Sequence, residues 1–180
     1  IHSGFGKVTA DIGIRNIIDK YRPMEIGGQI STEDLEINKI VDNIPVGKCT
    51  MHSGLSATLG KNGPEMTIDS LKVDHLEVLD YGYTGIAAAG TFSQDAFNGR
   101  IVCSDPNLNF LFQGIFSLSS KTQNALYQFY ANLGYADLHA LNIDKRGTSR
   151  ISLTTQANFT RVSGEEILGN INVNGIVLED

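Results

Sequence analysis

Apolar and polar residues alternate along most of this chain, and the longest alternating pattern follows the turn Asp105-Pro106-Asn107. From Leu108 to Leu118, apolar side chains recur at alternate positions and polar ones stand between them. A second such stretch runs from Ala125 to Tyr135. A period of two residues is typical of a strand with one buried face. The two stretches therefore predict a long antiparallel hairpin joined by the polar residues 119–124.

Alternation on both sides of this hairpin predicts a meander of about ten or eleven strands. The other expected strands span residues 7–14, 29–37, 48–59, 66–80, 86–92, 97–103, 151–160 and 167–177. Asn62-Gly63 predicts a tight hairpin turn. Within residues 66–80 the apolar positions shift phase, which predicts bulges that curve a sheet. The pattern indicates an all-β fold with about one to three short helical turns.

Four strands in the second half of the chain carry large apolar residues that sequential pairing would bring to one side of the sheet. These residues are Leu108, Phe110, Phe112, Phe116, Tyr127, Phe129, Leu133, Ile151, Leu153, Phe159, Ile171, Val173 and Val177. Tyr135 is expected on the same side. Twist of about 20–25° between strands would bend this long, mostly antiparallel meander into a β-taco-like trough with the apolar face inside. The alternative is an open sandwich, in which opposing apolar faces form a dry core.

A weak internal repeat relates residues 7–20 to residues 29–43. In each copy an apolar pair follows the predicted strand: Ile17-Ile18 in the first and Ile40-Val41 in the second. We expect both pairs to form brief helical turns that pack into an end of the sheet as plugs.

The chain starts at Ile1 with no initiator Met, and it shows neither a leader nor an apolar run of membrane-spanning length. We interpret residues 1–180 as a single β-rich segment of a longer protein. The formal net charge is −6 and Lys and Arg are scattered, which argues against a nucleic-acid partner. Cys49 and Cys103 lie far apart and outside any metal-binding spacing, so we predict that both are small buried hydrophobes.

None of the candidate catalytic or metal-binding patterns has the residues and the arrangement that its chemistry requires. Gly47-Lys48-Cys49 departs from a phosphate-binding loop at both ends, and His52-Ser53-Gly54 lacks the surrounding G-x-S-x-G of a hydrolase. His75 lies among Asp69, Asp74, Glu77 and Asp80, but alternation places these side chains on both faces of one strand. We predict no catalytic residues, no metal and no cofactor, and therefore a protein that is not an enzyme.

Five short blocks carry a resemblance to a known family. They are DSLKV at 69–73, YGYTGI at 81–86, FNGRI at 97–101, SDPNLNFLFQG at 104–114 and YADLHALNI at 135–143. In their order and spacing they resemble AsmA-like proteins, in particular the TamB translocation and assembly proteins of Bacteroidetes-type bacteria. The resemblance covers nearly the whole chain and is weakest around residues 19–43.

This resemblance implies a segment of a long periplasmic protein that is anchored by a helix in the inner membrane and extends towards the outer membrane. Members of the family use a curved sheet as a trough whose apolar interior carries phospholipid between the two membranes. The implied ligand is a phospholipid or another acyl chain, bound along the apolar face. Some members also resemble partners in outer-membrane protein assembly, so the alternative is a structural or chaperone-like module whose sheet edge pairs with strands of those proteins.

Overall fold

The chain forms a single antiparallel sheet in a computed structural model that describes residues 2–19, 21–60, 63–93, 95–118, 125–145, 147, 149–163 and 166–179. The strands are β1 (His2–Ser3), β2 (Gly6–Arg15), β3 (Met24–Glu36), β4 (Val46–Gly60), β5 (Gly63–Val78), β6 (Tyr81–Tyr83), β7 (Ile86–Ser93), β8 (Ala96–Asp105), β9 (Leu108–Ser117), β10 (Ala125–Asp137), β11 (Arg150–Ser163) and β12 (Glu166–Glu179). One short 3₁₀ helix, η1 (Ile37–Lys39), lies between β3 and β4.

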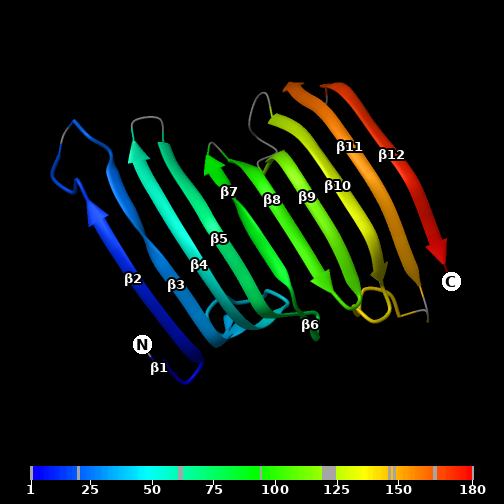
Figure 1. Ribbon diagram of the computed structural model, residues 1–180, viewed down its shortest axis with the longest axis horizontal. Coiled ribbons are helices and arrows are strands. Elements are labelled where there is room, and N and C mark those ends of the chain that lie inside the picture. The colour runs from blue at the N-terminus through cyan, green and yellow to red at the C-terminus, as the bar shows by residue number, and fades with distance from the viewer. Residues whose placement is uncertain are drawn as a thin grey trace.

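The strands pair in the order in which they occur in the sequence. Every neighbour along the path from β1 to β12 is antiparallel, and the short β6 lies off this path on β5. The sheet is open, with β1 and β12 at its two edges, and Figure 1 shows the chain ends at opposite ends of its long axis. The prediction of an all-β antiparallel meander is confirmed. The described strands form one sheet, so the sandwich alternative is wrong.

Cross-strand register brings apolar residues from nearly every strand to one face, which we call the apolar face. One row of partners runs Ile14, Ile26, Ala57, Met66, Phe92, Phe97, Phe116, Tyr127, Phe159 and Gly169. A second runs Ala10, Ile30, Ser53, Leu71, Ala88, Ile101, Phe112, Ala131, Thr155 and Val173. A third runs Val8, Thr32, Met51, Val73, Ile86, Cys103, Phe110, Leu133 and Leu153.

Aromatic rings form a chain along the middle of the apolar face. Consecutive contacts join Phe92, Phe97, Phe112, Phe129, Phe116, Tyr127 and Phe159, with ring centroids 4.6 to 6.2 Å apart. Such separations give favourable ring-to-ring contacts in addition to the burial of apolar area. The chain of rings therefore connects five neighbouring strands, β7 to β11.

Glycines at one level of the sheet make room for these rings. Gly90, Gly99 and Gly114 are cross-strand partners on β7, β8 and β9. A Cβ atom added at Gly90 or Gly99 would lie 2.7 or 2.6 Å from the Phe97 ring. Phe97 consequently lies flat against the sheet and is only 5% exposed, although the described strands form no second layer above it.

Two β-bulges overturn two of the predicted side-chain directions. A bulge between Leu133 and Tyr135 makes Tyr135 the partner of Asn109, on the face opposite the apolar one. A register shift in the pairing of β11 with β12, where Gly175 has φ +62°, makes Val177 the partner of Ser152. Each extra residue reverses the alternation, so placing Tyr135 and Val177 on the apolar face was wrong. Bulges were predicted for residues 66–80, and register shifts occur there at Ile68/Leu71.

The expected plugs are only partly present. A helical turn does precede Ile40, whose N–H donates to the Ile37 carbonyl oxygen at 2.9 Å. Ile17 and Ile18 form a simple turn instead, and Ile18 is 95% exposed. Ile40 and Val41 are exposed as well. The prediction that these pairs pack into the sheet is wrong, since isolated apolar pairs in a turn have no facing surface to cover.

A different segment packs at the end of β10. Residues 138–145, which we call the rim loop, fold back after β10, and Leu141 is only 1% exposed. The N–H of Leu141 donates to the Asp137 carbonyl oxygen at 3.0 Å, and Asn142 Nδ2 donates to the Leu79 carbonyl oxygen, also at 3.0 Å. The rim loop thus ties the end of β10 to the turn after β5. Figure 1 shows this loop beside the lower ends of the central strands.

Phe112 and Phe116 offer a direct test of this packing, because both lie on β9 in the same chain of rings. Phe112 is 9% exposed and Phe116 is 39% exposed. We expect Phe112→Ala to lower the free energy of unfolding by about 3 kcal/mol and Phe116→Ala by clearly less. Urea unfolding followed by circular dichroism measures both losses. Equal losses would contradict the burial difference.

Candidate functional site

The apolar face is continuous across the sheet. From β2 to β12 it crosses ten strands, and the nine spacings of roughly 4.8 Å between them give a length of about 43 Å. Its three rows contain no charged residue, and Thr32, Ser53 and Thr155 are their only hydroxyl side chains apart from that of Tyr127. A face of this length has the shape of a surface for an extended apolar partner rather than of a pocket for a small molecule.

Exposure on this face follows the position of the strand. Val73, Phe97 and Phe112 in the middle of the sheet are buried by their neighbours on both sides. Ile14 on β2 is exposed, and Ile171 on β12 is 55% exposed. The described strands form only one layer, and the exposure of the face is greatest towards its two ends. Monomeric soluble proteins rarely leave so large a contiguous apolar surface uncovered.

The register brings twelve of the thirteen predicted site residues to the apolar face. They are Leu108, Phe110, Phe112 and Phe116 on β9, Tyr127, Phe129 and Leu133 on β10, Ile151, Leu153 and Phe159 on β11, and Ile171 and Val173 on β12. Val177 is the exception, for the reason given above.

Half of the apolar face was missing from the predicted site, because strands β2 to β8 were expected but their side chains were not included. Met66, Phe92 and Phe97 continue the row of Phe116 directly. The alternation in β7 and β8 was sufficient to find Phe92 and Phe97. In β4 and β5 the repeated register shifts hide the match, so Met66 could be aligned only from the structure.

A buried carboxylate, that of Asp105, stabilises the end of the sheet at the turn between β8 and β9. Asp105 accepts hydrogen bonds from the N–H and Oγ1 of Thr84 at 2.9 and 3.0 Å, from the Asn107 N–H at 2.8 Å and from Tyr81 Oη. Burial alone would raise the pKa of Asp105, but these donors, Tyr81 first, outweigh it and leave the pKa lowered. Burial, followed by the bond to Asp105, raises the pKa of Tyr81 to about 12.

The cysteine and histidine side chains that the structure describes lie apart from one another. Cys49 and Cys103 are buried and unpaired, as predicted, and burial raises the pKa of both thiols, which makes them poor nucleophiles. Among the residues that the structure describes, no three His, Cys, Asp or Glu side chains come together as a metal site. His52 lies 3.4 Å from Asp74 on the exposed opposite face.

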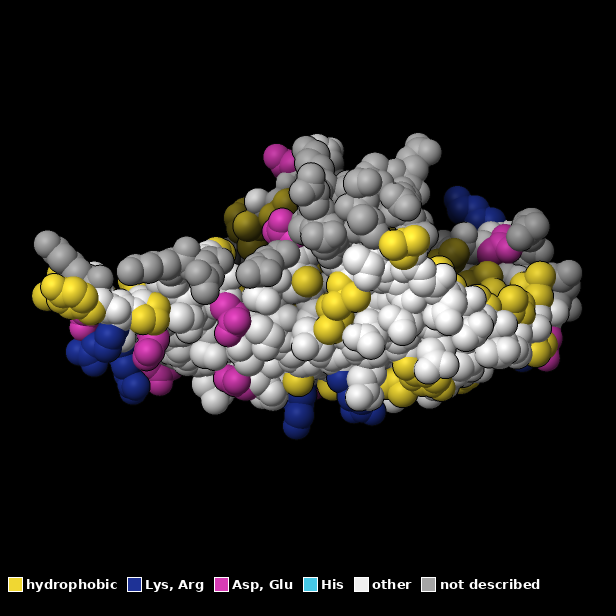
Figure 2. Space-filling view, turned by 90° about the horizontal axis from the view of Figure 1, so that it is seen from above, with side chains coloured by type: hydrophobic (Ala, Val, Ile, Leu, Met, Phe, Trp, Pro, Cys, Tyr) yellow, Lys and Arg dark blue, Asp and Glu magenta, His cyan; other side chains and the backbone are white. Residues whose placement is uncertain are grey.

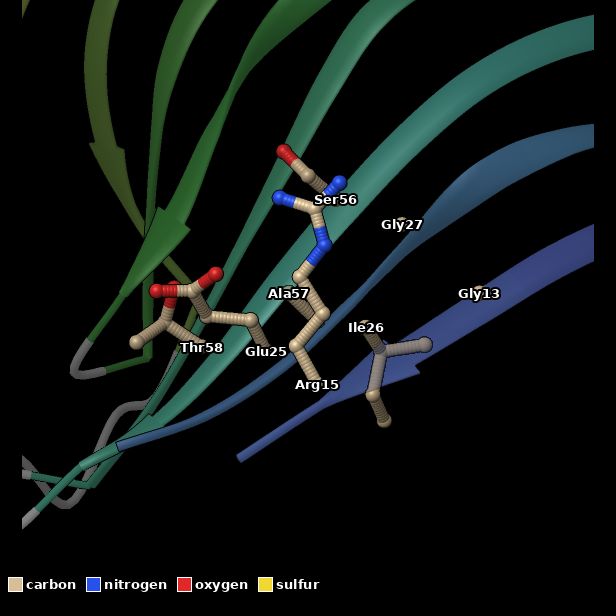
Figure 3. Close-up of a pocket in the computed structure, with 8 residues that line it drawn as sticks. All are labelled: Gly13, Arg15, Glu25, Ile26, Gly27, Ser56, Ala57 and Thr58. Carbon is tan, nitrogen blue, oxygen red and sulfur yellow. The ribbon is translucent and has the colours of Figure 1, made fainter. Parts of the chain in front are cut away.

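The face opposite the apolar one is polar and shallowly hollowed. Near β2 to β4 a hollow of about 340 Å³ has Gly13 and Gly27 as its floor and Arg15 and Glu25 at its side. Figure 3 shows Arg15 and Glu25 directed to the same side of the sheet, whereas Ile26 points away from them. Arg15 and Glu25 are exposed cross-strand partners of opposite charge, an arrangement that favours a solvated surface.

Fold and faces together define a class of protein: an open, single-layer antiparallel sheet with one apolar and one polar face. Comparisons with family models, with curated proteins and with solved structures found no match for this chain. Within the described ranges, no helix has the length and apolar character needed to cross a membrane.

Asp105 gives the site a defined dependence on pH. The folded pKa lies below the unfolded value of about 3.9, so the carboxylate contributes stability at neutral pH and loses it as the pH falls below about 4. Asp105→Asn places an N–H₂ group against donors, and we expect a loss of about 1–3 kcal/mol near neutral pH. Urea unfolding should show this gap narrowing as the pH falls below about 4 and the carboxylate of the folded protein becomes protonated.

The control for this measurement is Asp69→Asn, because Asp69 is exposed on the same sheet. We expect little change from it at either pH. A gap between the native protein and Asp105→Asn that stays constant from neutral to acid pH would contradict the role of the carboxylate.

Proposed function

We propose that this chain is a non-enzymatic β-trough module of an AsmA/TamB-like protein of the periplasm. In this proposal its apolar face shields the acyl chains of phospholipid in transit between the inner and the outer membrane. The observation that carries the proposal is the continuous apolar face, whose three rows contain no charged residue and over which the described strands form no second layer.

The chemistry of the face supports an acyl chain as the ligand. Burying apolar area stabilises by about 25 cal/mol per Å², without any requirement for direction. A flexible hydrocarbon chain can therefore contact any part of the three rows equally well. The half-buried Phe110, Leu133 and Leu153 form one continuous stretch along β9, β10 and β11. A polar headgroup would remain in water beyond the strand ends.

Leu153 and Ser152 provide a matched pair for testing this proposal, because they are neighbours on β11 that face opposite sides. The chain is purified without detergent and analysed by native mass spectrometry and by extraction of bound phospholipid. We expect the native protein and Ser152→Asp to retain phospholipid. Leu153→Asp should lose it at least about tenfold, because a carboxylate in contact with an acyl chain costs several kcal/mol.

Melting temperature distinguishes loss of ligand from loss of fold in this experiment. A half-buried, solvent-accessible position should tolerate Leu153→Asp with a modest decrease in melting temperature. Lipid retained at the native level while stability collapses would mean that Leu153 belongs to a closed core. A native protein that carries no phospholipid after gentle purification would also contradict the proposal.

A second candidate is a chaperone-like module that pairs through its edge with strands of outer-membrane proteins. One observation favours it: in the described structure β12 pairs with β11 alone, and Leu168 to Leu178 contain neither a charged residue nor Pro. Natural edge strands usually carry such residues, because they block pairing with other chains. The same mass spectra separate the two candidates, since bound phospholipid supports the first and a bound extended peptide supports the second.

A further inference from the structure

The polar face changes in character along the sheet. Over β2 to β8 it carries charged side chains such as Lys7, Asp11, Lys72 and Arg100. Over β9 to β12 it is dominated by amides, and charged residues stand only near the ends of those strands. Figure 2 shows Lys and Arg side chains projecting from the lower surface at the left and centre, whereas white and yellow predominate on the right.

The amides of β9 to β12 all lie on this polar face. Six of them line a hollow of about 610 Å³ and are called the amide patch: Gln113, Gln128, Gln156, Asn158, Asn170 and Asn172. Register places Gln128, Asn158 and Asn170 side by side in one row. The next row contains Gln113, Tyr130, Gln156 and Asn172. Neighbouring amides are roughly 4.8 Å apart across strands and about 6.7 Å apart along a strand.

These amides are available to a ligand. All six are exposed, and within the described part of the chain none of their side chains has a hydrogen-bond partner. Thr154 and Asn132, on the same face just outside the patch, do bond to one another at 2.9 Å. Each free amide presents an acceptor oxygen beside a donor N–H₂ group. Tyr130 lies within the second row, and its half-exposed ring adds an apolar surface with a polar tip.

We propose that the amide patch binds a neutral glycan chain. Sugar hydroxyl and acetamido groups are both donors and acceptors, so they match amides in two rows. The Tyr130 ring can contact the apolar side of a sugar ring. No charged side chain lines the hollow, and a charged ligand would require an opposite charge there. This inference goes beyond the proposed lipid transport, because it concerns the other face of the sheet.

Isothermal titration calorimetry with cellohexaose and with chitohexaose tests this proposal on the whole chain. We expect binding of at least one of these neutral oligosaccharides. Gln156→Ala and Asn172→Ala should each weaken it about 3- to 10-fold, the effect of one lost hydrogen bond. Tyr130→Ala should weaken it as well. Melting temperatures should be unchanged for the two amide variants, since their side chains are exposed and unpaired.

Gln29→Ala is the matched control, because Gln29 is an exposed amide on the same polar face of β3, at the charged end of the sheet. Its binding should equal that of the native protein. Failure to bind either neutral hexamer overturns the proposal. Binding only to an anionic oligogalacturonate overturns it too, because that would indicate a site at Arg100. Self-association through the patch, detected by sedimentation and lost in Gln156→Ala, would identify a second copy of the chain as the occupant instead.

Discussion

Side chains of a strand alternate between two faces, so each of the nine pairings from β2 to β12 must keep its register for the apolar face to be continuous. A slip of one residue at any pairing would move the apolar side chains of every later strand to the opposite face of the sheet, where they would be exposed to water. The register is held partly by the rings that contact across strands, from Phe92 on β7 to Phe159 on β11. Gly90 and Gly99 allow the ring contacts of Phe97, because a Cβ atom at either position would collide with the Phe97 ring.

Bulges are the means by which this sheet departs from strict alternation without losing its apolar face. At Gly134 the extra residue turns Tyr135 to the polar side, where its hydroxyl donates to the backbone oxygen of Asp105 at 3.2 Å. The same turn around Asp105 also binds Tyr81, Thr84 and Asn107. The bulge therefore converts a residue that fits the apolar pattern into part of the polar network at the rim. This single inserted residue consequently affects both the pairing of β10 with β9 and the hydrogen bonds around Asp105.

The sequence was sufficient for the fold class and for most of the apolar face, because a period of two residues is a local property. From Leu108 to Leu133 the pattern alone placed Phe110, Phe112 and Phe129 correctly. It failed at Tyr135 and Val177, since both residues fit the alternation of their own strand and only the pairing with the partner strand shows the bulge. It also missed Leu141, whose burial depends on the end of a sheet formed by residues far away in the chain. The amide patch could not be predicted from the sequence, because its two rows exist only once four strands are aligned.

A single-layer sheet with an uncovered apolar face links its stability to whatever occupies that face. In a two-layer protein the second layer contributes the burial, but the described strands here form one layer, and inner side chains such as Val73 and Phe97 are buried within it. The outer ones, such as Ile14 and Ile171, remain exposed. A ligand that covers them binds the folded sheet and not the unfolded chain, so it stabilises the fold in proportion to the logarithm of its concentration. The fraction of protein that carries the ligand and the fraction that is folded then rise and fall together. The polar face stands outside this coupling, because its exposed amides contribute little to the stability of the sheet.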